Sequence, residues 1–538
     1  MAGGTTIVIP LLFCCWVVWN FARFALAARR SPFLPPGPPT IPLLGNLHQL
    51  PASKAFLRFQ EWAKQYGPII SVKTGPGNLV VLNSAKDVKE LFDKRVSIYS
   101  SRPPNHIGNE LIARDNVHLL LMPYGQTWRN QRKIYQALVS ITAVRSLQPI
   151  QQAESSLTIH QLAQSPARYY DHIRRYSTGV ILSSVFGVRG PEFDHPNITR
   201  LYHVQDQFTA ILETGATAPV DVFPFLKRLP DVLSPWRRWA RRIREEQRQL
   251  YFELLQDAKD RRTRGVRRDC FMDQLLDESF RTKYELDDEH IAYIGGVLME
   301  GGSDTTASTL LSFLLAMTKY PRVFRKAQEQ VDSVCGTEHS PDFEHIAQLP
   351  YVKHCVSEVL RWRPVAAGGI PHVLVQDDEY EGYHFPAGTT FLANAWAIHN
   401  DPELYDRPDE FLPERYEQTP LGFKPDVADA TADGIRKTYA FGAGRRICPG
   451  SHLAESSLDI NIAKIIWAFD IGPGTDQATG RQMGVEDVNV DIATQWTDGF
   501  LIAPKPFPIR LSVRSEKHRE VLDRELEGAQ KIFDSYEE

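Results

Sequence analysis

The sequence contains few cysteines for its length. Six cysteines occur among 538 residues, and none of them forms a C-x-x-C pair. Disulfide frameworks and cysteine-rich zinc sites need closely spaced cysteines, so both are excluded as the basis of this fold. The sequence also lacks an excess of positive charge, since 61 Lys and Arg residues stand against 65 Asp and Glu residues. We therefore expect no nucleic-acid partner.

A dinucleotide-binding segment is also absent, because no G-x-G-x-x-G follows a predicted strand. Any chemistry that uses a nicotinamide or a flavin must therefore draw on another protein. What is present is a composition of 43% hydrophobic and 23% charged residues, with no internal repeat. This composition predicts a globular protein whose core is large enough to enclose a cofactor.

The N-terminus carries one long apolar stretch, residues 7–28. As a helix it measures about 33 Å, close to the ~30 Å hydrocarbon core of a membrane. A cleaved signal peptide is the alternative, because residues 25–27 resemble a small-x-small cleavage site. No Lys or Arg precedes the stretch, whereas Arg23, Arg29 and Arg30 follow it. This charge order favours a retained transmembrane helix with the body on the cytoplasmic side of the membrane.

The rest of the chain divides by composition into a hinge, a body and a tail. We predict a membrane anchor over residues 1–30, a proline-rich hinge over 31–52, a catalytic domain over 53–514 and a charged C-terminal tail over 515–538 without a core partner. Hydrophobic periodicity predicts a mainly α body with a small β part. The clearest predicted helices cover 53–66, 287–319 and 449–469, and the clearest predicted strands cover 69–73, 79–82, 370–390 and 488–513.

The most informative segment is residues 441–450, FGAGRRICPG, in which a single cysteine precedes a predicted helix. The helix N-terminus and the turn amides favour a thiolate at Cys448. Gly444 permits a tight turn, and Gly450 allows a flat ligand to approach the backbone. Phe441 can shield the sulfur from water, and Arg446 offers a fork for a carboxylate.

This segment resembles the F-x-x-G-x-R-x-C-x-G haem loop of the cytochrome P450 monooxygenases. The resemblance implies haem b with Cys448 as the axial ligand of its iron, and with Phe441, Gly444, Arg446 and Gly450 around it. The alternative is a buried structural cysteine in a turn.

A second motif, GGSDTT at residues 301–306, lies inside a predicted apolar helix. Glycine costs about 1 kcal/mol in a helix interior, so the pair needs a reason, and a groove for a ligand at Gly301 is one. The motif resembles the family's [AG]-G-x-[DE]-T-[TS]. By that resemblance Asp304 and Thr305 are catalytic: Thr305 orients dioxygen and Asp304 connects the proton path. Helix packing through glycine and a helix N-cap are the alternatives.

Three further segments resemble family motifs. Glu358 and Arg361 form an E-x-x-R pair, and Arg415 in a P-E-R segment completes an implied structural ion triad. Tyr416 departs from the family's usual phenylalanine. Three other E-x-x-R pairs in the chain lie in polar surroundings, so the pair alone is weak. Trp128 and Arg132 resemble the W-x-x-x-R helix that faces the haem propionates.

His372 begins a predicted strand and looks like one more propionate contact, although a lone histidine is also common in protein cores. The resemblance covers about residues 35–514 in family order. It implies the cytochrome P450 fold, preceded here by the predicted transmembrane helix, and a membrane-anchored microsomal type. The sequence as a whole resembles the fungal secondary-metabolism members of the family.

The implied function is a haem-thiolate monooxygenase that inserts one atom of O2 into a hydrophobic small molecule, such as a natural-product intermediate. Electrons would come from NADPH through a separate flavoprotein, an NADPH–cytochrome reductase. The implied location is the endoplasmic reticulum membrane, with the body facing the cytoplasm. The expected substrate pocket contains small and apolar residues: Gly301, Val365, Ala366, Ala367, Phe500 and Leu501.

Basic residues occur in sequence around the haem-facing motifs, and we expect them to dock the reductase: Arg129, Lys133, Arg436, Lys437 and Arg445. Scattered surface charge is the alternative. Three rival functions stay open. A haem-thiolate enzyme that rearranges peroxides lacks the acid–hydroxyl pair, which is intact here. A gas sensor needs an output domain, and a structural membrane protein leaves the cysteine loop without a purpose.

Overall fold

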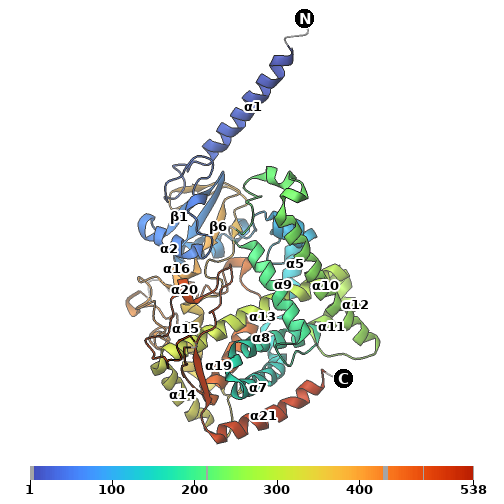
Figure 1. Ribbon diagram of the computed structural model, residues 1–538, viewed down its shortest axis with the longest axis vertical. Coiled ribbons are helices and arrows are strands. Elements are labelled where there is room, and N and C mark those ends of the chain that lie inside the picture. The colour runs from blue at the N-terminus through green and yellow to red at the C-terminus, as the bar shows by residue number, and fades with distance from the viewer. Residues whose placement is uncertain (1–4, 214–215, 428–433, 477, 537–538) are drawn as a thin grey trace.

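The computed structural model describes residues 5–213, 216–427, 434–476 and 478–536. Figure 1 shows a helical body with a small sheet near one end. Helix α1 (Thr5–Ala27) projects from that end, and helix α21 (Glu516–Asp534) lies at the opposite end. The mainly α architecture with a small β part agrees with the sequence prediction.

The longer helices of the body are α2 (Ala55–Tyr66), α5 (Gln126–Leu138), α7 (Gln148–Gln164), α8 (Tyr169–Phe186), α9 (Pro196–Leu212), α10 (Pro235–Thr263), α13 (Asp288–Lys319), α14 (Pro321–Cys335), α15 (Pro350–Trp362) and α19 (Ser451–Ala468). Shorter helices are α3 (Ala85–Val88), α4 (Val96–Tyr99), α6 (Ile141–Ser146), α11 (Phe271–Leu275), α12 (Glu278–Tyr284), α16 (Ala395–His399), α17 (Arg415–Gln418) and α20 (Ile492–Gln495). The strands are β1 (Ile69–Thr74), β2 (Gly77–Leu82), β3 (His372–Val373), β4 (Asp378–Tyr380), β5 (Tyr383–Phe385), β6 (Thr390–Ala393), β7 (Phe469–Pro473) and β8 (Ile509–Val513).

Helix α13 forms the centre of the body. Its C-terminal half is buried on all sides, and there Leu310 and Leu314 pack with Val359 of α15 and Ile462 of α19. A helix that is apolar around its whole circumference must be covered by other helices, and α8, α10, α15 and α19 cover it. This burial fixes α13 as a rigid wall for whatever lies beside it.

The main sheet has the strand order β1-β2-β6-β3. Strands β1 and β2 form the hairpin that the sequence predicts, and β6 then joins β2 in parallel, with Val80 opposite Phe391. Strand β3 pairs with β6 and places His372 opposite Phe391. The sheet therefore joins residues that lie more than 300 positions apart in the sequence.

The predicted helices at 53–66, 287–319 and 449–469 are confirmed as α2, α13 and α19. The prediction of strands over 488–513 is largely wrong. Only β8 is a strand there, and α20 occupies part of the segment. Asp491 explains the helix, since its side chain caps α20 by accepting a hydrogen bond from the backbone N–H of Ala493.

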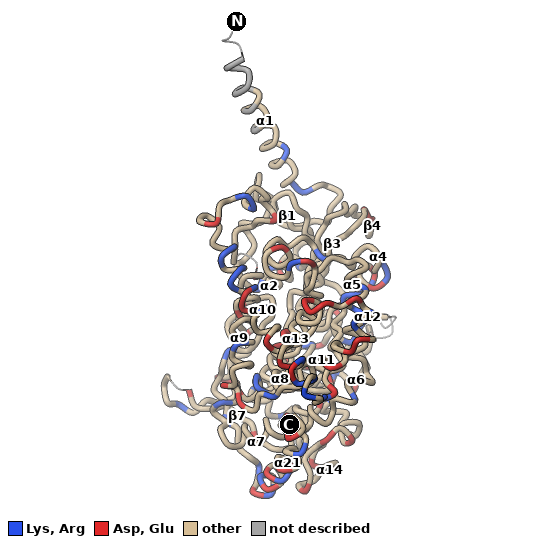
Figure 2. Tube along the Cα trace, turned by 90° about the vertical axis from the view of Figure 1, so that its right-hand side faces the viewer, with Lys and Arg blue, Asp and Glu red and all other residues tan. Residues whose placement is uncertain are grey.

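The prediction of a transmembrane helix at the N-terminus is not supported. Among the described residues, no helix combines the length and the hydropathy that a membrane span requires. Asn20 and Arg23 place polar side chains in the continuation of the apolar run. Residues 1–4 of the predicted anchor lie outside the described residues. In Figure 2 a blue segment interrupts the lower part of α1, whereas charges of both signs cover the body.

The expectation that the C-terminal tail has no core partner is wrong for its described part. Helix α21 packs along α7 and buries Val521, Leu522, Ala529 and Phe533. Lys464 of α19, which is only 1% exposed, pairs with Glu525 of α21 at 2.7 Å. The charged composition of the tail hid an apolar stripe on one side of the helix.

Candidate active site

The loop that carries Cys448 is closed by hydrogen bonds at both of its ends. The backbone N–H of Cys448 donates to the carbonyl of Phe441 at 2.8 Å. Gly444 has a φ of +64°, and a Cβ there would lie 2.3 Å from the carbonyl oxygen of Phe92. Its N–H donates to Asp93 at 2.8 Å. Glycine is required at this turn, and the loop holds Cys448 just before α19.

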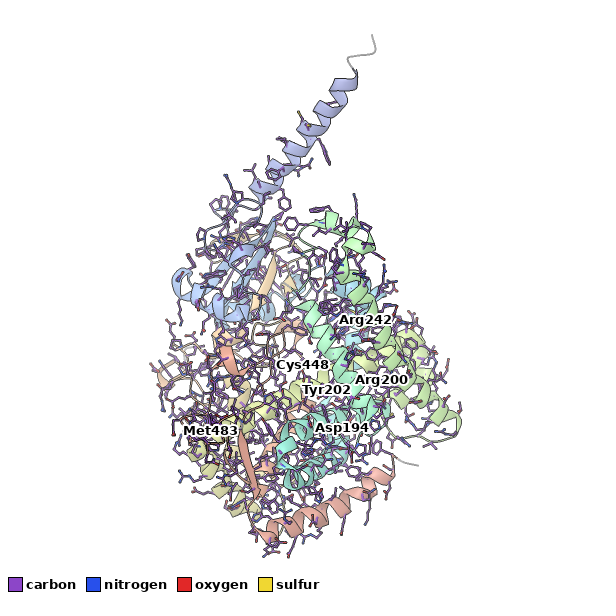
Figure 3. All side chains as sticks on the ribbon, viewed as in Figure 1. Asp194, Arg200, Tyr202, Arg242, Cys448 and Met483 are labelled. Atoms are coloured by element: carbon purple, nitrogen blue, oxygen red, sulfur yellow. The ribbon has the colours of Figure 1, made fainter. Side chains whose placement is uncertain are left out.

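Without a metal ion, the environment of the Cys448 sulfur favours the thiol over the thiolate. Burial raises the pKa of the Cys448 thiol, and the N–H of Gly450 and the charge of Arg132 offset this only in part. A coordinated metal ion deprotonates a thiol outright. The site therefore suits a metal ligand better than a free nucleophile. Figure 3 labels Cys448 near the middle of the body in this view.

A single cavity connects Cys448 with α13. Most of the residues that sequence analysis assigns to the site line it: Trp128, Arg132, Gly301, Thr305, Val365, Ala366, His372, Phe441, Arg446, Cys448, Gly450, Phe500 and Leu501. Asp304, Gly444 and Ala367 are not among the lining residues. Ala367 is buried in the neighbouring core instead.

Three arginines form a positive wall of this cavity: Arg102 and Arg132, which are buried, and Arg446, which is partly buried. None of them forms an ion pair with a described carboxylate within 4 Å. Burial lowers the pKa of Arg446 to about 8, and the charges of Arg102 and Arg132 add to the effect. Burial likewise lowers the pKa of Arg102 to about 9. Buried charges need a counter-charge, so this wall suits an anionic ligand.

Free N–H donors accompany the arginines. The indole Nε1 of Trp128 and the Nε of Arg132 are buried without a partner among the described residues. Arg446 uses its guanidinium on the carbonyls of Ser100 and Met122, both at 2.7 Å. Arg446 thus ties the loop around residue 120 to the cysteine loop while its charge stays uncompensated.

His372 lies in the same wall. Its Nδ1 donates to the carbonyl of Tyr99 at 2.7 Å, and its ring stacks on Phe92 at 4.1 Å between centroids. Burial and the charge of Arg102 lower the pKa of His372. The ring orientation is therefore fixed, and an anion beside Nε2 would favour the protonated form.

The opposite wall is the glycine segment of α13, where the two glycines have different surroundings. A Cβ on Gly301 would have no atom within 4 Å, so this position is open. A Cβ on Gly302 would lie 2.2 Å from Cδ1 of Ile181 in α8, so this glycine serves helix packing. Gly301 therefore fits the explanation of a ligand groove, and Gly302 fits the alternative of helix packing.

Thr305 and Asp304 follow the glycines. The Thr305 hydroxyl faces the cavity and donates to the carbonyl of Gly301 at 2.7 Å. The Asp304 side chain is 24% exposed and lies 4.0 Å from the guanidinium of Arg174. Burial raises the pKa of Asp304, and Arg174 opposes that shift. Thr305 therefore borders the cavity, whereas the Asp304 carboxylate lies beside Arg174 of α8 and outside the cavity lining.

Glu358, Arg361 and Arg415 come together in a fully buried ion triad. Arg361 pairs with Glu358 at 2.8 Å, and Arg415 pairs with Glu358 at 3.1 Å. The arginines also donate to backbone carbonyls, among them those of His399 and Asp406. Every charge has partners, which is the condition for a buried triad to fix local geometry.

Among the cavity-wall residues that no sequence motif singles out are Arg102, His118 and Glu300. None of them lies in a recognisable local pattern. Glu300 precedes the glycine pair, so its position next to a functional motif is a signal that was available. Arg102 and His118 lie on irregular segments, where only the three-dimensional structure brings them to the cavity.

Together these residues fit haem. The Cys448 sulfur can ligate the iron, and a Cβ on Gly450 would touch only that sulfur, at 4.0 Å. A Cβ on Gly442 would meet nothing within 4 Å, so a flat group can lie against this backbone. The uncompensated arginines and the free donor of Trp128 match two propionates.

Comparison with known proteins agrees with this geometry. Residues 35–484 match the family described as Cytochrome P450. The chain is 40% identical over 512 residues to the cytochrome P450 monooxygenase atE of Aspergillus terreus, covering 95% of this chain and 93% of that protein. It is 37% identical over 546 residues to the cytochrome P450 monooxygenase acuC of Aspergillus aculeatus, covering 100% and 98%. The chain therefore belongs to the cytochrome P450 family of oxygen-incorporating oxidoreductases.

Proposed function

We propose that this chain is a haem-thiolate monooxygenase that inserts one atom of O2 into a hydrophobic small molecule. Its electrons come from NADPH through a separate flavoprotein reductase. One observation carries the proposal: the Cys448 sulfur, three uncompensated arginines and the Thr305 hydroxyl line one cavity. No other common cofactor combines a thiolate-ligated metal with two carboxylates on a flat ring.

The residues of the cysteine side hold the cofactor. Cys448 ligates the iron, and Arg132, Arg446, Trp128 and His372 bind the propionates. Bound haem supplies the activation of dioxygen, which no side chain can perform. The protein contributes the sulfur donor, the charge balance and the exclusion of water.

The α13 side delivers protons. Thr305 can turn its hydroxyl from the Gly301 carbonyl toward the cavity, and Asp304 collects protons at the outer side of the helix. The raised pKa of Asp304 favours a carboxyl group that carries a proton for part of the time. Arg174 positions this carboxyl, since it lies 4.0 Å from it.

The substrate side of the cavity is lined by small and apolar side chains. Val365, Ala366, Phe500 and Leu501 line it, and Gly301 leaves space against the helix. A hydrophobic substrate follows from this lining. The resemblance of the chain to fungal secondary-metabolism members supports a natural-product intermediate as the substrate.

A cysteine replacement tests the haem-thiolate assignment. We expect Cys448→Ser to lose the red-shifted Soret band of the reduced, CO-bound protein, because a serine oxygen does not supply a thiolate. Cys335→Ser is the matched control, since Cys335 is buried in α14 away from the cavity. Retention of the band in Cys448→Ser would overturn the proposal. NADPH-dependent turnover with added reductase then separates a monooxygenase from a peroxide-rearranging enzyme.

A further inference from the structure

A polar pair that the proposed chemistry does not use lines the same cavity as Cys448. His118 is 3% exposed, and its Nε2 donates to the Glu300 carboxylate at 3.1 Å. Glu300 directly precedes the glycine pair of α13 and has a side chain that is 8% exposed. Buried ionisable groups of this kind are costly, so their presence in the cavity wall needs a reason.

The Glu300 carboxylate is fixed by three donors, one from the segment around residue 118 and two from α10. Besides His118, Gln247 donates to it at 2.8 Å and the Tyr251 hydroxyl also donates, both from α10. This arrangement holds a hydrogen on Nε2 of His118, so the ring presents Nδ1 as its other polar atom. Nδ1 is buried and has no hydrogen-bond partner among the described residues.

The imidazole ring is also held from outside the pair. It stacks on Phe208 of α9, with 5.4 Å between ring centroids. The segment behind it is clamped by two arginines of the cavity wall: Arg446 donates to the Leu119 carbonyl at 3.2 Å, and Arg102 donates to the Leu120 carbonyl at 3.0 Å. A ring that is held by one hydrogen bond and one stacking contact, and that has one unpaired nitrogen, is pre-organised for a ligand atom.

We propose that His118, positioned by Glu300, binds a hydroxyl group of an otherwise apolar substrate. This inference rests on the proposed function, in which the cavity receives the substrate. A hydroxyl suits either state of the ring, since it donates to a neutral Nδ1 and accepts from a protonated one. The neighbouring wall residues Val297, Leu298 and Phe208 are apolar. The polar wall residues Gln205 and Thr209 already form hydrogen bonds within the protein.

The anchor also restricts where the substrate is oxidised. Thr305 lies five residues beyond Glu300 on α13, which corresponds to about 7.5 Å along the helix axis. A hydroxyl held at His118 therefore keeps its own carbon away from the oxygen-activating end. The new oxygen enters at a carbon several bonds distant from the anchored hydroxyl.

Matched pairs of probes test the anchor on the unmodified, haem-loaded protein. Calorimetry compares 4-ethylphenol with ethylbenzene, and 4-ethylcyclohexanol with ethylcyclohexane, to distinguish phenolic from aliphatic hydroxyls. We expect at least one hydroxyl probe to bind about threefold or more tightly than its hydrocarbon. A wholly apolar cavity would prefer the hydrocarbons, so a smaller preference in both pairs overturns the inference.

Variants then assign the preference to the pair. His118→Phe removes the nitrogen but retains a ring, and we expect the preference for the hydroxyl probe to fall about tenfold or to reverse. Glu300→Gln tests positioning, and it should reduce the same ratio of dissociation constants in part. Thr209→Val is the matched control, because its hydroxyl lines the cavity but already donates to backbone carbonyls. An unchanged ratio in His118→Phe contradicts the assignment.

The CO-bound spectrum of each protein separates the two proposals. A protein with the thiolate-type Soret band but without hydroxyl preference refutes the anchor alone. A protein without that band refutes the haem-thiolate assignment. Calorimetry does not depend on the haem spectrum, so the preference for the hydroxyl probe can be measured whether or not the thiolate-type band is present.

Discussion

Adjacent residues of α13 meet different demands, as Gly301 and Gly302 illustrate. Glycine at each position makes the helix less stable than alanine would, by about 1 kcal/mol. At Gly302 the reason is that Ile181 of α8 occupies the place of its Cβ. Gly301 lies in a place with no neighbour, where the cavity begins. The absence of a side chain therefore allows close helix packing at Gly302 and leaves space for a ligand at Gly301.

This difference predicts opposite effects of alanine. We expect Gly302→Ala to lower the free energy of unfolding by about 1 kcal/mol net, because overpacking of ~1–3 kcal/mol outweighs the propensity gain. Gly301→Ala should leave stability equal or higher. Chemical denaturation of both variants checks the prediction, which is wrong if Gly302→Ala is the more stable of the two.

The buried triad around Glu358 supports a second prediction at this scale. Arg415→Met leaves Glu358 with only one of its two guanidinium partners, and we expect a loss of about 3–5 kcal/mol. Arg407→Gln is the control, because Arg407 is 54% exposed and its pairing with Glu410 should contribute less than ~1 kcal/mol. Denaturation followed by tryptophan fluorescence measures both variants. Equal losses in the two would contradict the expected role of burial.

At the scale of elements, α21 is joined to the body by both packing and charge. Phe533 is buried and lies under the guanidinium of Arg189, 3.4 Å from its ring centroid. The Glu525 carboxylate accepts hydrogen bonds from the Lys464 ammonium group at 2.7 Å and from the Ser340 hydroxyl at 2.6 Å. The helix therefore completes the core around α7, and its boundary at residue 515 does not mark a free tail.

The contact between Glu525 and Lys464 predicts a pH dependence. Burial acts to raise the pKa of Glu525, but Lys464 and Ser340 outweigh burial, so this pKa lies below its usual value of 4.5. A lowered pKa means that the carboxylate stabilises the fold fully above about pH 4.5. The contribution is lost as the pH falls through the folded-state pKa.

We therefore expect Glu525→Gln to be less stable than the unmodified protein at pH 7, by roughly 3 kcal/mol, because Lys464 stays buried without its partner. The difference should shrink in acid below pH 4.5. Glu527→Gln on the exposed side of the same helix is the control. Denaturation curves at pH 7 and at pH 4 test this, and a difference that grows in acid would refute it.

At the scale of the molecule, the structure brings part of the expected reductase-docking residues together. Arg129 and Arg445 both lie against the Tyr124 ring, at 5.7 and 5.3 Å from its centroid. Lys133 follows Arg129 by one turn of α5 and is exposed. Arg436 instead pairs with Asp93 at 2.6 Å, so its charge is partly compensated. Arg129, Lys133 and Arg445 form no ion pair with a described carboxylate, so these three are the candidates for steering an acidic partner.

Charge reversal tests this face. We expect the double variant Lys133→Glu, Arg445→Glu to reduce reductase-supported turnover several-fold, and the turnover of the unmodified protein to fall with rising salt. The matched control reverses Arg238 and Arg242, two exposed residues of α10 of which Figure 3 labels Arg242. Equal effects of the two double variants would refute a localised docking face.

Local patterns predicted much of this molecule, and the reason is physical. Cys448 and its flanking glycines act within ten residues, so their spacing records the turn they form. The His118–Glu300 contact spans 182 residues, and no pattern of either segment specifies the other. Asp93 likewise binds the Gly444 amide from a distant helix. For α21, the stripe of Leu522, Ala529 and Phe533 was a usable signal that the surrounding charges obscured.

The parallel pairing of β2 with β6 has a consequence for biosynthesis. Strand β2 ends at Leu82, but its neighbour begins only at Thr390. The edge of β2 stays unpaired until some 300 further residues have been synthesised. This takes tens of seconds at ~5–20 residues per second. During this interval an unpaired strand edge is exposed to other nascent chains. Production of the intact enzyme in a foreign host should therefore respond to slower translation and to chaperone supply more than to changes in the cofactor pocket.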